Sequence, residues 1–289
     1  MPDFDPVAHE ELKREIVGVY DRASDLYDQV GIKQFTYYAQ RLIDKLQISA
    51  GAKVLDVATG RGALLFAAAE KVGDAGRVLG IDLAPNMVAL TNTEIRSRGL
   101  VNAEVRHLDA DDIDFPPATF DFILCGFAIH FLNYPKLMPR FRQMLKSGGK
   151  FATTHPYVPT HDTANFERWK WLFELTKEVF PPDFEPPASW VAPNRLNSPE
   201  RIQAALREAG FDQIDIESVE TTLHFADEED WWQWEWSQGS RFWVEGMSPE
   251  GLEKFKRISF ENLKKMKTPQ GIPMLDGALL SIASPPDQE

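Results

Sequence analysis

The sequence predicts an α/β protein built around a doubly wound, mostly parallel β-sheet. Between residues 51 and 156, apolar segments of strand length alternate with helical segments, an order typical of a parallel sheet with helices on both faces. A loop of small residues, 58–62, joins the first strand to the first helix, and Asp82 ends the second strand. The chain has 289 residues, of which 43% are hydrophobic, so we expect one large core with an elaborated cap.

The alternating part of the chain supplies the first five predicted strands. The apolar run "AKVLDVA" (52–58) indicates a buried strand, and the alanine-rich stretch 62–72 indicates a helix. Pro85 suits the first turn of the second helix, and Gly99 suits its end. The remaining elements are strands at 76–82, 103–109, 120–127 and 150–156 and helices at 85–98 and 134–146, the last of which closes at "SGG".

The C-terminal part continues the pattern. "SPERIQAALREAGF" (198–211) opens with a serine that can cap a helix and a proline that suits its first position, and it closes at Gly210. "DQIDIESVETTLHF" (212–225) predicts a long strand, and "IPMLDGALLSIAS" (272–284) predicts a final one.

Three segments interrupt the alternation, and they divide the chain. Ligands of a parallel sheet bind at the carboxyl ends of its strands, and we expect these segments to be helical elaborations that cover this edge. The predicted organisation is an N-terminal helical lid (1–48), a ligand-binding α/β core (49–156), a cap insertion (157–197), a core helix and strand (198–226), a tryptophan-rich helical cap insertion (227–268), and a final strand and tail (269–289).

Composition restricts the partners. The net charge of −13 argues against a general nucleic-acid binder. No apolar run approaches the ~20 residues of a membrane-spanning helix, and "MPDFDPVAHEE" lacks the apolar core of a signal peptide. The single cysteine, Cys125, permits no internal disulfide, which suits a reducing compartment. We therefore expect a cytoplasmic protein without a nucleic-acid partner or a membrane span, and a homo-oligomer is compatible with the sequence.

The stretch "VLDVATGRGALL" (54–65) indicates a ligand site. A glycine loop before a helix presents backbone N–H groups that attract carboxylates and phosphates, and Gly60 and Gly62 allow close approach. Asp82 can accept hydrogen bonds from two ribose hydroxyl groups. These features alone also suit NAD. However, the loop reads A-x-G-x-G from Ala58 rather than G-x-G-x-x-G, and Asp56 adds a negative charge that suits an ammonium group. A ribose together with an amino-acid head indicates S-adenosylmethionine.

These motifs resemble those of class I S-adenosylmethionine-dependent methyltransferases. "VLDVATGRG" is similar to the first motif, and "GIDLAPNMV", "HLDADDIDFP", "FDFILCGFAIHFL" and "LKSGGKFATTHP" are similar to the next four, in the right order. "YDRASDLYD" (20–28) is similar to an N-terminal pattern of the ubiquinone- and menaquinone-biosynthesis branch. The resemblance implies a Rossmann-like sheet of seven strands with the last strand antiparallel.

The resemblance also implies cofactor contacts. It implies that Asp82 holds the ribose, that Leu83 and Met87 flank the adenine, and that Asp109 meets the adenine amino group beside the backbone of Ala110. Tyr20 and Tyr27 are seven residues apart and so share a helix face; they either pack as core or close over the methionine end of the cofactor. The full set of predicted cofactor residues is Tyr20, Tyr27, Asp56, Ala58, Gly60, Gly62, Asp82, Leu83, Met87, Asp109, Ala110 and Cys125.

Methyl transfer needs alignment of the acceptor and exclusion of water, and a general base helps when the acceptor is a phenol, an amine or a carbon acid. His155 follows the fifth strand and is the first candidate base. His130, after the fourth strand, is the second, and Glu235 is held in reserve. Each histidine can equally be structural. The other histidines show no metal-ligand spacing with them, so we expect no metal.

The stretch "DWWQWEWSQGSRFWVEGM" (230–247) is rich in tryptophan. As a single helix it would align Trp232, Trp236 and Trp243 in one stripe. The stripe either packs on the core or walls an apolar acceptor pocket, with Glu235 or Arg241 as its polar contact. Three further tryptophans of the other insertion, which favour a small apolar or aromatic acceptor, are Trp169, Trp171 and Trp190.

Three functions follow from these observations. The first is a methyltransferase that acts on a small apolar or aromatic metabolite, for example in natural-product biosynthesis. The second is a protein of the same fold that binds the cofactor but catalyses another reaction, such as a cyclisation. The third is an NAD(P)-dependent oxidoreductase, against which Asp56 and the missing third glycine argue.

Overall fold

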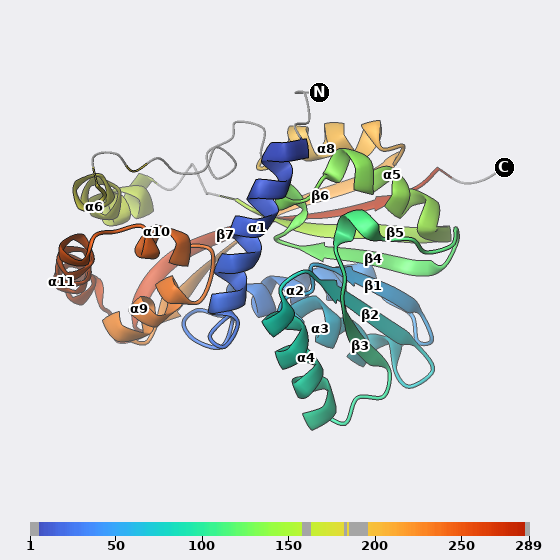
Figure 1. The fold of residues 1–289 in the computed structure, drawn as a ribbon, viewed down its shortest axis with the longest axis horizontal. Coiled ribbons are helices and arrows are strands. Elements are labelled where there is room, and N and C mark those ends of the chain that lie inside the picture. Colours follow the sequence, from blue (N-terminus) through green and yellow to red (C-terminus); the bar gives the residue numbers. More distant parts are fainter. Residues whose placement is uncertain (1–5, 158–162, 182–183, 185–195, 287–289) are drawn as a thin grey trace.

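The computed structural model describes residues 6–157, 163–181, 184 and 196–286. These residues form a seven-stranded sheet with the order β3-β2-β1-β4-β5-β7-β6 (Figure 1). The strands are β1 (Lys53–Val57), β2 (Arg77–Asp82), β3 (Ala103–His107), β4 (Phe120–Gly126), β5 (Leu145–Pro156), β6 (Gln213–Phe225) and β7 (Ile272–Ser284).

The strand directions confirm the predicted fold class. β1 pairs in parallel with β2 and β4, β2 with β3, and β4 with β5. The last strand, β7, lies between β5 and β6 and is antiparallel to both. The order reverses between β1 and β4, so the carboxyl ends of these two strands border the crevice in which ligands of such sheets bind.

Helices cover both faces of the sheet. Val54 belongs to a core cluster with Leu42 and Leu65, whereas its neighbour Leu55 belongs to a second cluster with Phe141 and Leu206. Neighbouring strand residues thus point to opposite, equally apolar faces. The helices of the first face include α2 (Gln34–Leu46) and α3 (Ala63–Val72), with α4 (Pro85–Ser97) alongside, and those of the second are α5 (Tyr134–Met144) and α8 (Pro199–Glu208).

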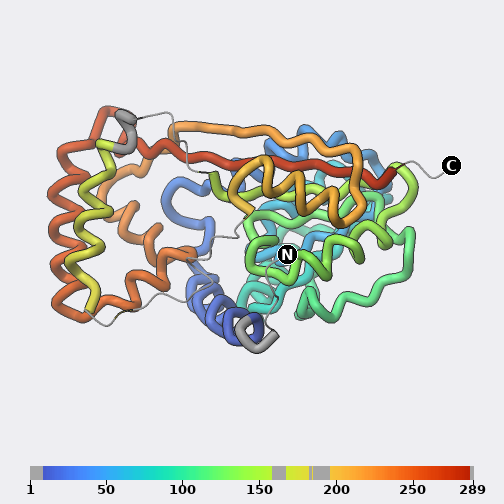
Figure 2. Tube along the Cα trace, turned by 90° about the horizontal axis from the view of Figure 1, so that it is seen from above, coloured from blue at the N-terminus to red at the C-terminus, as the bar shows by residue number. Residues whose placement is uncertain are grey.

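A helical cap lies beside the α/β core (Figure 1). Figure 2 shows β6 and β7 extending from the core into this cap. The far ends of the two strands, Phe225 and Ile272, are buried with Trp231 and Phe255 in a third apolar cluster. We use the word cap for α6 (Thr163–Val179), α9 (Glu228–Trp236), α10 (Arg241–Glu245) and α11 (Pro249–Met266).

The N-terminal helix α1 (Pro6–Ala23) lies between the cap and the core, where it contacts α4 and α10 (Figure 1). Residues of α1 therefore lie near the carboxyl ends of the core strands. None of the helices in the described part of the chain is long and apolar enough to cross a bilayer.

Three local predictions were wrong. The stretch 230–247 is not one helix, because the hydroxyls of Ser237 and Ser240 donate hydrogen bonds to the backbone carbonyls of Trp234 and Glu235 and end α9. The predicted helix over 134–146 ends at Met144, and "SGG" lies within β5. The shared helix face of Tyr20 and Tyr27 does not exist, because α1 ends at Ala23. Trp190 and His161 lie outside the described residues.

Candidate functional site

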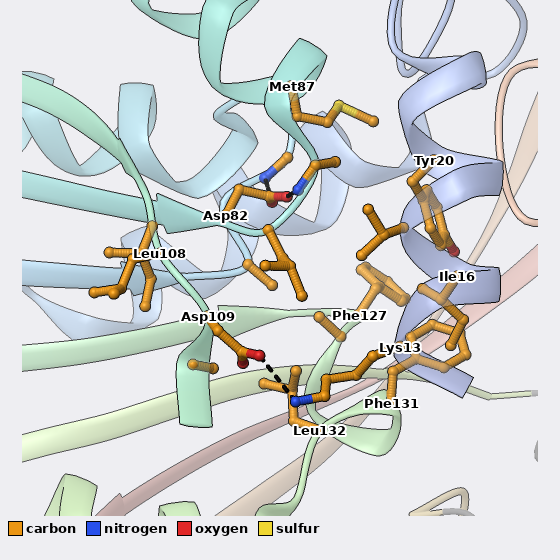
Figure 3. A pocket seen from close by; sticks show the side chains of 18 of the residues that line it. Lys13, Ile16, Tyr20, Asp82, Met87, Leu108, Asp109, Phe127, Phe131 and Leu132 are labelled. Carbon is orange, nitrogen blue, oxygen red and sulfur yellow. Dashed lines mark hydrogen bonds and ion pairs between the residues drawn. The ribbon is translucent and has the colours of Figure 1, made fainter. Parts of the chain in front are cut away.

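A cavity opens at the carboxyl ends of β1, β2 and β4, with α1 along one side (Figure 3). It holds about 830 Å³ of empty space, counting the solvent at its mouth. Nine of the predicted cofactor residues line it: Tyr20, Tyr27, Ala58, Gly60, Asp82, Leu83, Met87, Asp109 and Ala110.

The glycine loop is built on left-handed backbone. Ala58, Gly60 and Gly62 have φ values of 54°, 52° and 82°, a region that favours glycine. A Cβ on Gly60 would lie 3.5 Å from Tyr27 Cε1, so the loop passes close under the Tyr27 ring. A Cβ on Gly62 would lie 2.8 Å from Phe66 Cε2. Gly62 therefore allows α3 to pack and does not line the cavity.

Asp82 fixes the loop to the neighbouring strand. Its Oδ2 accepts a hydrogen bond from the Gly60 N–H at 2.7 Å, and its Oδ1 accepts one from the Ala84 N–H at 2.9 Å. Burial raises the pKa of this carboxyl above its usual value, although both N–H groups oppose the shift. A carboxylate oxygen can accept more than one hydrogen bond, so Asp82 retains acceptor capacity toward the cavity.

Asp56 is buried beside the loop, with 1% of its surface exposed. Its Oδ2 accepts a hydrogen bond from the Thr59 hydroxyl at 2.6 Å, whereas its Oδ1 has no hydrogen-bond partner among the described residues. Burial, with the charge of Asp82 in addition, raises the pKa of Asp56 to about 7. An unsatisfied buried carboxyl oxygen is costly unless a donor reaches it, so this site fits the ammonium group of an amino-acid ligand.

Asp56 lines a second cavity that adjoins the first. The second cavity holds about 940 Å³ of empty space and shares Tyr27, Ala58, Gly60 and Phe127 with the first. The glycine loop therefore separates a largely apolar cavity from a polar one. A ligand with a purine at one end and an amino acid at the other matches this division.

Asp109 lies at the rim of the first cavity and is held from two sides. Its Oδ1 accepts a hydrogen bond from the Asp111 N–H at 2.9 Å, which caps a short 3-10 helix, η1 (Ala110–Asp112). Its Oδ2 accepts one from the Lys13 ammonium group of α1 at 2.8 Å (Figure 3). The two hydrogen bonds thereby fix the orientation of the carboxylate.

Aromatic rings close the cavity between the loop and α1. The rings of Tyr20 and Tyr27 meet edge to face with centroids 5.7 Å apart, and Tyr27 stacks on Phe35 at 4.7 Å. Phe127 and Phe131 line the same cavity. Edge-to-face and stacked rings of this kind pack densely, so they can exclude water from a ligand held between them.

Sequence reasoning missed several of the lining residues, including Lys13, Phe127, Phe131 and Leu132. Phe127 carried a signal, because it ends the predicted fourth strand. Its φ of 52° is held by Thr154, whose hydroxyl and carbonyl oxygens both accept from the Phe127 N–H. Lys13 carried no such signal, because the two rim residues that it contacts, Asp109 and Asp111, lie 96 and 98 residues further along the chain.

The candidate bases lie in different surroundings. His155 is fully buried in β5, lines neither cavity, and has a pKa lowered by burial to about 3. His130 lies on a second 3-10 helix, η2 (Ile129–Phe131), with its ring centroid 4.1 Å from that of Phe131, which lines the first cavity. Glu235 is buried in the cap, and burial raises its pKa to about 7.

Cys125 and the cap residues also lie outside both cavities. The Cys125 thiol is buried in β4, and burial raises its pKa. Trp232 packs on Phe255 of α11, and Trp243 packs on Phe180 and Phe184. Arg241 donates to the backbone carbonyl of Arg22 at 2.7 Å. In the described part of the chain, no group of histidine, cysteine and acidic residues is arranged to hold a metal ion.

Comparisons with known proteins agree with this geometry. A family model described as a methyltransferase domain matches residues 54–149. Nocamycin O-methyltransferase of Saccharothrix syringae is 31% identical over 241 residues, covering 80% of this chain and 85% of that protein. Aklanonic acid methyltransferase DauC of Streptomyces sp. (strain C5) is 38% identical over 145 residues, covering 50% and 66%. Demethylmenaquinone methyltransferase of Geobacillus sp. (strain WCH70) is 28% identical, covering 69% and 86%.

Solved structures share the fold. The YcgJ protein of Bacillus subtilis superposes with a TM-score of 0.55 at 20% identity, covering 86% of this chain and 99% of that one. The [4+2]-cyclase SpnF superposes with a TM-score of 0.52 at 17% identity, covering 85% and 81%. Because one of these proteins is named a cyclase, the fold by itself does not select the reaction.

Proposed function

The chain belongs to the S-adenosylmethionine-dependent methyltransferases, and we propose that it transfers a methyl group to a small apolar or aromatic metabolite in natural-product biosynthesis. The observation that carries this proposal is the pair of adjoining cavities. The polar one presents the Asp56 carboxyl, and the largely apolar one carries Asp82 and Asp109 at its edge. This arrangement matches one ligand with an amino-acid head, a ribose and a purine.

Each of three acidic residues would bind a different part of the cofactor. Asp82 would hold the ribose hydroxyls, Asp109 would accept from the adenine amino group, and Asp56 would pair with the ammonium group. Leu83 and Met87 supply apolar walls beside Asp82. When bound, the cofactor supplies a sulfonium-activated methyl group.

The protein then has to orient the acceptor and keep water out. Tyr20, Tyr27, Phe127 and Phe131 form the aromatic side of the cavity, next to the glycine loop. A dry, aromatic surround can hold the acceptor in line with the sulfonium methyl group and prevents loss of that methyl group to water.

A general base would receive the acceptor's proton where the acceptor is a phenol, an amine or a carbon acid. Position supports His130, because its ring packs on Phe131. His155 is supported less, because a group with a pKa of about 3 binds a proton weakly at neutral pH. Glu235, with a pKa of about 7, has a suitable pKa but lies in the cap.

The acceptor class rests on the cap and on the relatives. The cap concentrates tryptophans around α9 and α10, and Arg241 joins α10 to the end of α1. We place the acceptor between the cap and α1, with Trp236, Trp243 and Arg241 beside it and Trp232 behind. The names of two relatives, aklanonic acid methyltransferase and nocamycin O-methyltransferase, support a small natural product.

We also propose a cytoplasmic protein without a nucleic-acid partner. The single cysteine, which is free and buried, suits a reducing compartment. The net charge of −13 disfavours binding to phosphate backbones. Light scattering at several protein concentrations would test for a homo-oligomer.

One experiment tests the function directly. The protein is incubated with S-adenosylmethionine carrying a labelled methyl group and a panel of small aromatic compounds that includes phenols and carboxylic acids. We expect label in at least one acceptor and calorimetric binding of S-adenosylmethionine but not of NAD. Binding without label in any acceptor, together with a changed carbon skeleton, would support a cyclase instead. Absence of cofactor binding would reject the proposal.

A further inference from the structure

One face of α1 forms a wall of the first cavity. Ile16, Val17 and Tyr20 line the cavity together with Lys13, and their spacing places them on one side of the helix. Figure 3 shows Lys13, Ile16 and Tyr20 on the side of α1 that faces the cavity, with Lys13 reaching to Asp109. A cofactor bound in this cavity would therefore lie between α1 and the sheet edge.

Lys13 joins this helix to the opposite rim. Its Nζ lies 2.8 Å from Asp109 Oδ2 and 3.0 Å from Asp111 Oδ2, while the Lys13 side chain is only 11% exposed. Burial lowers the pKa of Lys13, but hydrogen bonds to Asp109, Glu10 and Asp111 outweigh it, so the pKa lies above its usual value. The ammonium group is thus charged, and it lies between two carboxylates of the turn after β3 and the Glu10 carboxylate of α1 itself.

The C-terminal end of α1 is fastened to a second segment that borders the same cavity. The Asp21 carboxylate accepts hydrogen bonds from the Asn86 backbone N–H at 2.7 Å and from the Asn86 side-chain amide at 3.0 Å. Asn86 is next to Met87, which lines the cavity. The middle of α1, at Lys13, and its C-terminal end, at Asp21, are therefore tied by polar contacts to segments that border the purine end of the cavity.

We propose that Lys13 is a positioning residue for the cofactor: its ion pair with Asp109 and Asp111 holds α1 closed over the cavity and has to break before the cofactor leaves. This inference rests on the proposed function. Ile16, Val17 and Tyr20 supply the apolar contacts of α1 with the cavity. Lys13 supplies an ion pair that holds α1 in this position. Ion pairs near a surface weaken as salt screens them.

The test compares Lys13→Met with wild type and with Lys136→Met. Lys136 contacts the same turn, at 3.2 Å from the Asp111 carbonyl oxygen, but from α5 rather than from α1. Release of S-adenosylhomocysteine is followed by stopped-flow displacement. We expect Lys13→Met to release it about tenfold faster, the equivalent of ~1.4 kcal/mol, and Lys136→Met to match wild type. Added salt should speed release from wild type and leave Lys13→Met nearly unchanged, and Lys13→Arg should restore slow release.

A second readout does not depend on the cofactor. Hydrogen–deuterium exchange of residues 6–23 in the cofactor-free protein should be faster in Lys13→Met than in wild type, at an unchanged melting temperature. Lys13→Gln serves the same purpose if the methionine variant does not fold. If wild type and Lys13→Met show equal hydrogen–deuterium exchange in α1 and equal release rates of S-adenosylhomocysteine, the proposed role of Lys13 is wrong. If no variant, nor wild type, binds S-adenosylhomocysteine, the proposed function fails, and the exchange data alone decide whether Lys13 holds α1.

Discussion

The Asp82 carboxylate accepts a hydrogen bond from the backbone N–H of Gly60 at 2.7 Å, so the end of β2 is tied to the loop that follows β1. This contact joins the two segments that would hold the ribose and the amino-acid head of the cofactor. Asp82 thus shapes the loop as well as presenting acceptor oxygens to the cavity.

Replacing Asp82 by alanine should therefore weaken cofactor binding. Hydrogen bonds to a charged group are each worth about 1.5–3 kcal/mol, so we expect the Kd of S-adenosylmethionine to rise about 10- to 150-fold. Calorimetry measures this change. Asp82→Asn keeps one acceptor oxygen and should fall between alanine and wild type. An alanine variant with wild-type affinity would show that the ribose binds elsewhere.

Replacing Gly60 by valine should block the cavity. Gly60 has a φ of 52°, and its Cβ position lies 3.5 Å from the Tyr27 ring, so the branched side chain would occupy the space between loop and ring. Gly73→Val is the matched control, because Gly73 also has a positive φ, of 63°, but has open space around it. We expect both variants to lose some stability and only Gly60→Val to lose cofactor binding. Equal loss in both would attribute the effect to backbone strain.

Cofactor affinity should depend on the protonation of Asp56, whose pKa is raised to about 7 by burial. Only the charged carboxylate pairs with an ammonium group, so affinity should increase as the pH rises through about 7. Asp56→Asn should bind weakly with a flat pH profile. Titrations at several pH values, with both proteins, measure the difference, and a parallel pH dependence in Asp56→Asn would assign the effect to another group.

The same group should affect the stability of the cofactor-free protein. Between pH values of about 4 and 7, native Asp56 keeps a proton that the unfolded chain has lost, because its folded pKa lies above its unfolded value of 3.8. The free energy of unfolding should therefore decrease as the pH rises across this window. Urea unfolding of wild type and Asp56→Asn isolates the contribution, since other buried acids remain in both proteins. A steeper decrease in Asp56→Asn would contradict this assignment.

His130 and His155 should respond differently to replacement. If His130 accepts the acceptor's proton, His130→Ala should lower kcat about 10²- to 10⁴-fold with little change in cofactor Kd. His155→Ala should instead lose stability, because the ring is fully buried in β5. Melting temperatures and initial rates on the labelled acceptor separate the two effects. Wild-type kcat in both variants would turn attention to Glu235 or to an acceptor that needs no base.

The sheet and much of the cavity were predictable because their signals are local. The apolar run before Asp56, the small-residue loop and the acid at Asp82 lie within thirty residues of one another, and parallel topology then brings the strand ends together. The contact of Lys13 with Asp109 was not predictable, because it joins segments of different elements. The prediction of a single helix with one tryptophan stripe was wrong. The hydroxyls of Ser237 and Ser240 donate hydrogen bonds to backbone carbonyls that would otherwise accept from the next turn, and the helix ends there.

Replacing two tryptophans of the cap, one at a time, should distinguish a residue that binds the acceptor from one that only packs. Trp232 and Trp236 are both half-buried on α9, with ring centroids 6.0 Å apart. Trp232 packs on Phe255 in the cap interior. Trp236 instead packs against Arg241: the guanidinium carbon of Arg241 lies 5.5 Å from the centroid of the Trp236 ring. Arg241 also donates a hydrogen bond to the backbone of α1.

Trp236→Ala should raise the KM for the acceptor and leave the cofactor Kd near wild type, because the lost surface lies against Arg241, which is bonded to α1. Trp232→Ala should lower stability by less than the ~3–5 kcal/mol of a fully buried tryptophan, and should lower every activity together as the cap loosens. Thermal melts and separate titrations of cofactor and acceptor measure both effects. If the two variants lose stability equally and neither changes the acceptor KM, both tryptophans are packing residues, and the acceptor binds away from α9.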